Sequence, residues 1–187
     1  MRKLLRYLML MLAAVVFSLP CLGRAEAASV VLMDLINNTE NEQAGQIYFN
    51  SALTVLKDEA LDYTLEDNDA VQAAIAKNTA EGVLPDAKAL AAVCRDAKVD
   101  VVIAMQLDTC DDQKRWGNSE EEVLILDLQG RMLAYNNVTG RFVSKRIYND
   151  KRIEEALTGR WDWKNEELGR TIRLEMRRTL KEAAKVK

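Results

Sequence analysis

Histidine is absent from all 187 residues, and this absence removes the side chain that most often serves as a general base near neutral pH. Without histidine the chain can form neither a Ser-His-Asp triad nor the common zinc sites. Its eight glycines form no phosphate-binding loop and no dinucleotide fingerprint. The sequence therefore predicts a protein that is not an enzyme, with no catalytic residues, no cofactor and no metal site.

Cysteine is also scarce, with three residues in the whole chain. Cys94 falls near the end of a predicted helix, and Cys110 lies beyond the far end of the strand that follows. About ten strand residues at ~3.3 Å each separate those two ends. Because bridged Cα atoms lie only ~5.5 Å apart, we expect no disulfide between them. Cys94 is then a small buried apolar side chain.

The amino terminus has the pattern of a secretory signal. A basic start precedes a short apolar run over residues 8–19, and Ala25-Glu26-Ala27 provides an A-x-A cleavage signal. The run is shorter than the ~20 residues that span a bilayer, which disfavours the alternative of an uncleaved anchor. Cys21 follows Pro20 rather than the small residue that lipid attachment requires. Residues 1–27 are therefore predicted to be a cleaved signal peptide, and the protein to be exported to the periplasm or beyond the cell.

Positive charge is also in short supply once the signal is removed. Loss of Arg2, Lys3, Arg6, Arg24 and Glu26 changes the formal charge from −3 to −6. An acidic surface argues against a nucleic-acid partner, because phosphates require basic side chains. With two prolines in the chain and no linker rich in glycine or serine, residues 28–187 are predicted to form a single domain.

The first half of the mature chain alternates predicted strands and helices. The apolar run 30–36 predicts a strand buried on both faces. Thr39 and Glu42 match a capping box, which predicts a helix starting at Thr39. Residues 61–65 alternate in polarity and predict a half-buried second strand, after which Asp67 is placed to cap a short helix.

Residues 85–108 are the stretch around which the rest is predicted to be organised. They indicate a helix, a tight turn through Lys98, and a strand at 101–105 that is apolar at every position. An uninterrupted β-branched run is typical of a central strand covered on both faces. Strands that alternate with helices predict parallel pairing through right-handed crossovers.

The second half has a different pattern. Residues 111–122 are polar and predict a loop; residues 123–128 and 131–135 flank Gln129-Gly130 and predict a hairpin. A further strand is expected at 142–148, and a carboxy-terminal helix carries an apolar stripe of Leu168, Ile172, Met176 and Leu180. The predicted fold is α/β, becoming α+β in the carboxy-terminal half: a mixed sheet with helices packed on it, antiparallel hairpins after the central strand, and a carboxy-terminal helix.

Six side chains are candidates for binding a ligand or partner. Three acids lie just past the carboxyl end of the central strand, where open α/β sheets often bind ligands; a solvated acidic loop is the alternative. Three tryptophans fall in polar surroundings, and exposed tryptophan suits interaction surfaces; packing over the sheet edge remains equally open. The candidates are Asp108, Asp111, Asp112, Trp116, Trp161 and Trp163.

Three segments resemble a known group of proteins. They are VVLMDLINNT, LAAVCRDAKVDVVIAMQLD and LILDLQGRML, and Val99-Asp100 stands where that group usually has Ala-Asp. The pattern is similar to the small periplasmic α/β domains typified by the TolB amino-terminal domain, the curli-secretion component and the lipoprotein activators of penicillin-binding proteins. The resemblance covers residues 30–135 and implies binding to other envelope proteins without enzyme activity. The missing lipid-attachment cysteine departs from the lipoprotein members.

The sequence thus predicts a secreted, non-catalytic protein-binding module of the bacterial cell envelope. Its partner would be an envelope protein or a second copy, with no nucleic acid and no stable transmembrane anchor after cleavage. One alternative is a subunit of an envelope export or assembly complex, although Arg141, Lys145 and Arg146 disfavour a lipid-facing hairpin. The other is a carboxylate-dependent hydrolase that uses Asp108, Asp111 or Asp112.

Overall fold

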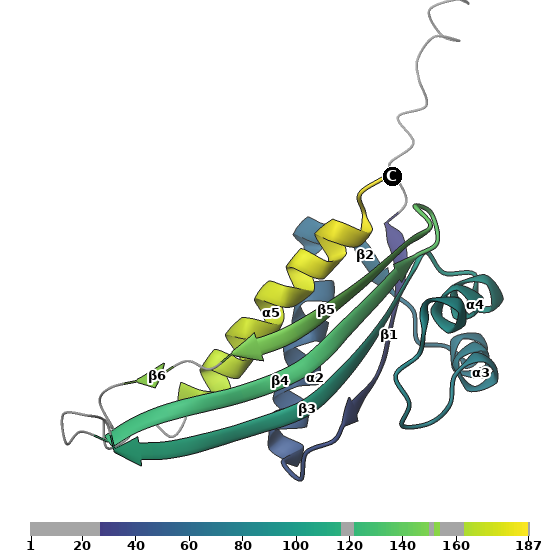
Figure 1. The fold of residues 1–187 in the computed structure, drawn as a ribbon. Coiled ribbons are helices and arrows are strands. Elements are labelled where there is room, and N and C mark those ends of the chain that lie inside the picture. The colour runs from purple at the N-terminus through teal and green to yellow at the C-terminus, as the bar shows by residue number, and fades with distance from the viewer. Residues whose placement is uncertain (1–26, 117–121, 150–151, 154–162, 187) are drawn as a thin grey trace, which may run out of the picture.

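The protein forms a mixed six-stranded sheet with helices on both faces (Figure 1), as the predicted fold class requires. The computed structural model describes residues 27–116, 122–149, 152–153 and 163–186. The strands are β1 (Ala28–Asn37), β2 (Tyr63–Leu65), β3 (Val101–Trp116), β4 (Glu122–Asn136), β5 (Arg141–Asn149) and β6 (Arg152–Ile153). The helices are α2 (Glu42–Leu56), α3 (Asp69–Asn78), α4 (Ala87–Ala97) and α5 (Trp163–Ala183), with a 3₁₀ turn η1 at Glu59–Leu61.

The strand order is β2-β1-β3-β4-β5, with β6 beside β4. β1 runs parallel to both β2 and β3, which confirms the predicted parallel pairing of the first half. β3, β4 and β5 are antiparallel to one another. β3 lies between the parallel and the antiparallel part, so its predicted central position is confirmed. In the described part of the chain, no helix has the length and apolar character needed to cross a bilayer.

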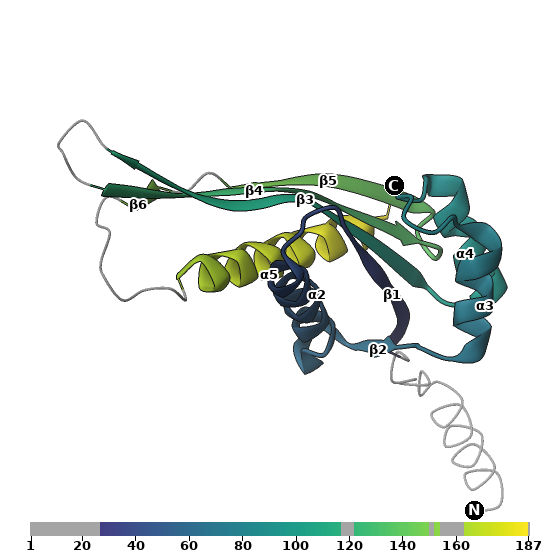
Figure 2. The same ribbon diagram turned by 90° about the horizontal axis from the view of Figure 1, so that it is seen from below.

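Helices cover both faces of the sheet (Figure 2), and each face has its own buried core. Val101, Ile103 and Met105 face α2 and α5, whereas the alternate residues Val102 and Ala104 face α3 and α4. Side chains of a strand alternate between faces, so a strand covered on both sides must be apolar at every position. On the α5 side the predicted stripe is confirmed: every member of Leu168, Ile172, Met176 and Leu180 is buried.

Two helix starts differ from the predicted ones. α2 begins at Glu42 because the Asn41 side chain accepts the Ala44 N–H at 3.0 Å, so the predicted cap at Thr39 is wrong. The Thr39 hydroxyl instead accepts the Asn41 N–H at 3.2 Å. α3 is capped by Asn68 rather than by Asp67. In both cases an asparagine one or two residues after the predicted residue takes the cap, because its short amide reaches the helix N–H groups equally well.

The predicted hairpin at Gln129-Gly130 is wrong, because β4 passes straight through Gly130. A Cβ at Gly130 would lie 2.5 Å from the Gln106 carbonyl oxygen, next to an irregularity in β3 between Leu107 and Thr109. Glycine is needed there for a close approach of two backbones. The predicted loop at 111–122 is also wrong over 111–116, where β3 continues. The actual turn between β4 and β5 contains Gly140, with φ of 63°.

Cys94 and Cys110 are both buried and not bonded to each other, which confirms the prediction. They lie in different cores, Cys94 under α4 and Cys110 on the α2 and α5 side. Burial raises the pKa of the Cys94 thiol to about 12, with a smaller contribution from Asp100. Cys94 is therefore an unreactive packing residue at neutral pH.

We predict that Gly130→Ala lowers the free energy of unfolding by about 1–3 kcal/mol, because the new methyl group meets fixed backbone rather than a flexible side chain. Urea denaturation measures the change. The matched control is Gln129→Ala, an exposed neighbour in the same strand, which should change stability by less than about 0.5 kcal/mol. Equal stability of the two variants would contradict a backbone contact at Gly130.

The Cys94 pKa predicts a pH dependence of stability. The unfolded thiol ionises near its usual value of 9 and the folded thiol near 12, so stability falls as pH rises through this window and is unaffected below it. Between about pH 8 and about pH 10, the wild-type protein should lose about 1 kcal/mol more than Cys94→Ala. Tyr48, whose pKa burial also raises, is present in both proteins and cancels. Parallel pH profiles would contradict the shift.

Candidate functional site

The three candidate aspartates lie within β3 rather than in a loop. Asp108 accepts hydrogen bonds from the Asn38 side chain at 3.0 Å and from the Gln106 side chain, and so ties the segment after β1 to β3. Asp111 is exposed and stands opposite Asp127 in the ladder. Asp112 stands opposite Leu126. The strand continues through this region because β4 pairs with Thr109 and every later residue of β3, whereas Asp108 lies at the irregularity between Leu107 and Thr109.

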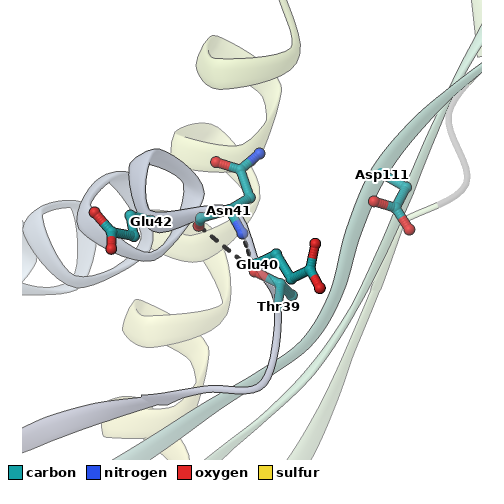
Figure 3. Close-up of a pocket in the computed structure, with 5 residues that line it drawn as sticks. All are labelled: Thr39, Glu40, Asn41, Glu42 and Asp111. Carbon is teal, nitrogen blue, oxygen red and sulfur yellow. Dashed lines mark hydrogen bonds between the residues drawn. The ribbon is translucent and has the colours of Figure 1, made fainter.

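Asp111 lines a shallow depression of about 490 Å³ at the start of α2 (Figure 3). The other lining residues are Thr39, Glu40, Asn41 and Glu42. The three carboxylates are exposed to water, so none is desolvated as a general acid usually is. Within the described ranges, no group of three or more His, Cys, Asp or Glu side chains is arranged to hold a metal ion. The depression is a solvated acidic surface.

Of the three candidate tryptophans, Trp163 has a side chain that the structure places in the core. Trp163 begins α5 and is only 7% exposed, packed in the core on the α2 and α5 side. Its polar sequence neighbours suggested a surface, but the ring packs inward from the first turn of an amphipathic helix. Trp116 ends β3 opposite Glu122, and Trp161 lies outside the described residues. The packing alternative therefore holds for Trp163.

A larger cleft, of about 850 Å³, runs along the edge of β1. β1 forms its floor, and Phe49 and Leu53 of α2 form one wall. α3 and the segment after it form the opposite wall, with Ile75 and Val83 among the lining side chains. Since the two helices belong to opposite faces of the sheet, the cleft encloses the strand edge from both sides.

The cleft exists because β2 is too short to cover β1. The two strands pair only over Ala28–Val30 of β1, and the Val30 carbonyl accepts the last hydrogen bond, from the Glu66 N–H at 2.8 Å. From Leu32 onward, no hydrogen bond reaches this edge from any described residue. The predicted burial of β1 on both faces is therefore wrong beyond Val31. The remaining apolar side chains of the strand are half-exposed: Leu32, Met33, Leu35 and Ile36.

Only part of this site is visible in the sequence pattern, an apolar run followed by a shorter alternating run. It showed an apolar strand at 30–36 and a second strand at 61–65, but not that residues 59–61 turn as η1 and leave β2 three residues long. Asp62 is in the left-handed conformation with φ of 52°. Aspartate tolerates this conformation better than most side chains, so the turn is compatible with many sequences and is hard to predict.

The charges around the cleft all have one sign. Asp34 projects from the floor strand, Glu66 and Asp67 follow β2, and Glu81 follows α3. Of these, Asp34, Asp67 and Glu81 are exposed and Glu66 is half-buried. No lysine or arginine is among the described residues that line the cleft. The cleft therefore combines an apolar floor and walls with an acidic rim.

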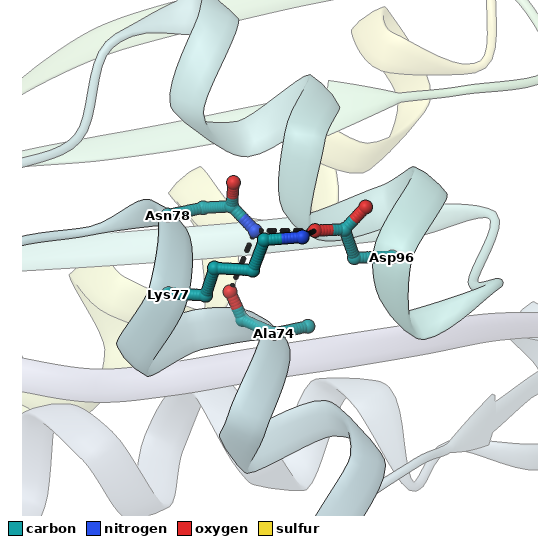
Figure 4. Close-up of polar contacts among 4 residues, drawn as sticks. All are labelled: Ala74, Lys77, Asn78 and Asp96. Atoms are coloured by element: carbon teal, nitrogen blue, oxygen red, sulfur yellow. Dashed lines mark hydrogen bonds and ion pairs between the residues drawn. The ribbon is translucent and has the colours of Figure 1, made fainter.

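The α3 wall is fixed in place by its packing on α4. Val71 and Ala74 of α3 share a buried cluster with Leu90 and Val93 of α4. At the exposed end, Asp96 accepts from the Asn78 amide at 3.0 Å and pairs with Lys77 at 2.9 Å (Figure 4). The hydrogen bond from Asn78, followed by that from Lys77, lowers the pKa of Asp96. Exposed pairs contribute little, so the buried cluster is what holds the wall.

No protein-family model matches the chain, and neither does any curated protein. Among solved structures it is similar to a putative neuraminyllactose-binding hemagglutinin homolog from Helicobacter pylori, with a TM-score of 0.48, 12% identity and coverage of 90% of this chain and 91% of that chain. For the PelC dodecamer from Paraburkholderia phytofirmans the TM-score is 0.42, the identity 14% and the coverage 83% and 87%. For lipoprotein GNA1162 from Neisseria meningitidis the corresponding values are 0.40, 11%, 82% and 99%.

These TM-scores lie below 0.5 and the identities below 25%. The similarity is limited to the general course of the chain. The matches are bacterial proteins, and one of them is named as a lipoprotein. The resemblance to the TolB, curli-secretion and activator domains remains a prediction from the sequence. The cleft beside β1 is therefore assigned from its own residues and geometry.

Proposed function

We propose that this chain is an exported, non-catalytic protein-binding module of the bacterial cell envelope, and that its partner binds in the cleft beside β1. The observation that carries the proposal is the apolar cleft along an unpaired strand edge. On this edge Leu32, Met33 and Leu35 are half-exposed and Asp34 is exposed, on a strand that lies between two helices. Such a surface is costly to leave in water, which favours a site that a partner covers.

The chemistry of the cleft suits a polypeptide better than a small substrate. Its floor offers backbone N–H and C=O groups in a row, and these complement another backbone. Its acids line the rim instead of converging on a reacting centre, and no serine, cysteine or lysine is among the described residues that line the cleft. The carboxylate hydrolase has no comparable support, because Asp108 is engaged by Asn38 and Gln106 while Asp111 is exposed on the surface.

Among the described residues, no specific observation favours the alternative that the protein is a subunit of an export or assembly complex. Lys145 and Arg141 of β5 pair with Glu182 of α5, at 3.0 Å and 3.8 Å. These cations therefore hold the sheet against its own helix. A strand pair that faces lipid requires an apolar outer face, whereas the exposed face of β5 carries Ser144 and Arg146 beside Phe142 and Tyr148.

Cleavage after Ala27 is compatible with the position of β1. β1 starts at Ala28, where the Ala28 N–H donates to the Asp62 carbonyl at 3.1 Å. Cleavage there leaves β1 and its pairing with β2 in place.

We predict that the full chain, expressed in a bacterial host, is recovered from the periplasm with Ala28 as its first residue. Mass spectrometry of the intact protein measures this. The control is Ala27→Pro, which should block cleavage because signal processing requires a small residue at that position. Recovery of the unprocessed wild-type chain from the cytoplasm would contradict export.

The binding proposal predicts site-dependent cross-linking in the bacterium that carries the gene. A photoreactive phenylalanine analogue is placed at Val83, on the cleft wall and 59% exposed, or at Val138, in the β4–β5 turn and 75% exposed. Light should couple the Val83 position, and not the Val138 position, to one defined protein that mass spectrometry identifies.

The adduct should also depend on the cleft itself. Leu53→Glu places a charge in the apolar wall and should abolish coupling at Val83, while circular dichroism confirms that the variant is folded. Equal coupling from both valines, coupling that survives Leu53→Glu, or no adduct at either position would each contradict the proposal.

A further inference from the structure

We infer that the cleft binds an extended, apolar peptide segment carrying lysine or arginine, and that this segment adds as a new strand to the open edge of β1. The inference rests on the proposed function, because it specifies which kind of partner surface enters the cleft. It assigns both a binding mode, β-strand addition, and a charge.

The backbone N–H and C=O groups of β1 point in the direction that strand addition requires. The Ala28 N–H and the Val30 carbonyl bond toward β2, whereas the Ser29 carbonyl bonds toward β3 by accepting the Asp100 N–H at 3.1 Å. Peptide groups along a strand alternate between its two sides. The N–H and C=O of Leu32 therefore point to the same side as those of Val30, where β2 no longer reaches. They are placed to bond to an added strand.

The cleft also has the dimensions of a strand. From Leu32 to Asn37 the floor offers about six residues, or roughly 20 Å at strand spacing. Phe49 and Leu53 would cover one face of an added strand, and Ile75 and Val83 the other. A strand covered on both faces is apolar at consecutive positions, so the centre of the occupant is apolar.

Charge complementarity selects the flanks of the occupant. Every charged residue among the described ones that line the cleft is acidic: Asp34, Glu66, Asp67 and Glu81. An acidic peptide would be repelled at the rim, whereas lysine or arginine gains attraction in a site that is partly screened from water. An apolar segment with basic flanks is the chemistry that fits.

The irregularities of β1 make this edge selective. Its register against β3 shifts between Leu32 and Leu35, and Asp34 is exposed beside the shift. Bulges and charges on an edge strand guard against unselected pairing. Here the protecting residue is an acid, Asp34. A segment that places a cation beside Asp34 compensates its charge and can pair, whereas strands without a cation are rejected.

The test uses the exported protein and a synthetic probe, a peptide of about ten residues, rich in valine and isoleucine, with lysines at both ends. Nuclear magnetic resonance follows the backbone amides. The lysine peptide should bind, slow hydrogen exchange of the Leu32 amide, and bind more weakly as salt is raised. The matched peptide with glutamates in place of the lysines should bind at least about tenfold more weakly.

Strand addition is separated from simple apolar contact by methylation of the peptide. Two sets of alternate peptide nitrogens are methylated in turn, and only one set can face β1. One set should lose at least about tenfold in affinity because its donors to β1 are removed, while the other set should bind nearly as before. Equal effects of both sets, or none, would overturn strand addition.

Charge reversal completes the test. Asp34→Lys should weaken the lysine peptide and strengthen the glutamate peptide, whereas Glu59→Lys, an exposed acid outside the cleft, should change neither. Unchanged preference in Asp34→Lys would overturn the charge assignment.

If the Val83 cross-link persists while the Leu32 amide is unaffected by any probe, the inference fails and the proposed function stands. If the cross-link is also absent, both fail. An amide pattern showing a second copy of this chain in the cleft would overturn the choice of occupant.

Discussion

Burial of β3 on both faces is the constraint on which the rest of the structure depends. Val101 to Met105 are at most 2% exposed, so helices must cover this strand from both sides. The start of β3 is fixed to β1 by a reciprocal contact: Asp100 accepts from both the N–H and the hydroxyl of Ser29 at 2.9 Å, and its own N–H donates to that hydroxyl at 2.9 Å. This contact sets the register of the parallel pair β1 and β3, in which Val30 stands opposite Val101.

The cleft follows from the same constraint. Covering β3 from both sides places α2 on one face and α3 with α4 on the other, so the two helical layers stand apart at the β1 edge by the thickness of the sheet. A full-length strand would close the gap between them. β2 closes it only over Ala28–Val30, and the helical walls continue past the point where the strand ends. The slot is therefore lined on both sides by side chains that would otherwise pack on such a strand.

Periodicity was enough to predict the kind and order of most elements. The run at 101–105 and the stripe from Leu168 to Leu180 each carry a repeat that burial imposes directly on the sequence. The wrong predictions concern residues whose conformation depends on a contact with a residue distant in the sequence. Gly130 is fixed by the Gln106 carbonyl across the ladder, and no local pattern distinguishes such a glycine from a turn. Caps at Asn41 and Asn68 were missed because several neighbouring residues could each have served.

The candidate site was harder to predict than the fold because it depends on a missing contact. The acids and tryptophans singled out by their types are spread over a strand, a core and a segment outside the described residues. The residues that form the cleft floor looked like ordinary core, since a strand of the same composition is buried wherever a neighbour pairs with it. Only the length of β2 separates these outcomes for Leu32 to Ile36.

The exposed edge is best explained as a retained feature. An unpaired apolar strand invites association with other chains, and two further pairing residues in β2 would remove much of that hazard. Instead the chain turns away at Glu66 directly after the last β2 hydrogen bond, and α3 is anchored on α4 by a buried cluster of its own. The wall on that side therefore does not require a strand beneath it. The fold could close this edge, yet the edge stays open between two walls that are anchored independently. The charged residues among the described ones that line it are all acidic. These are the properties of a binding slot.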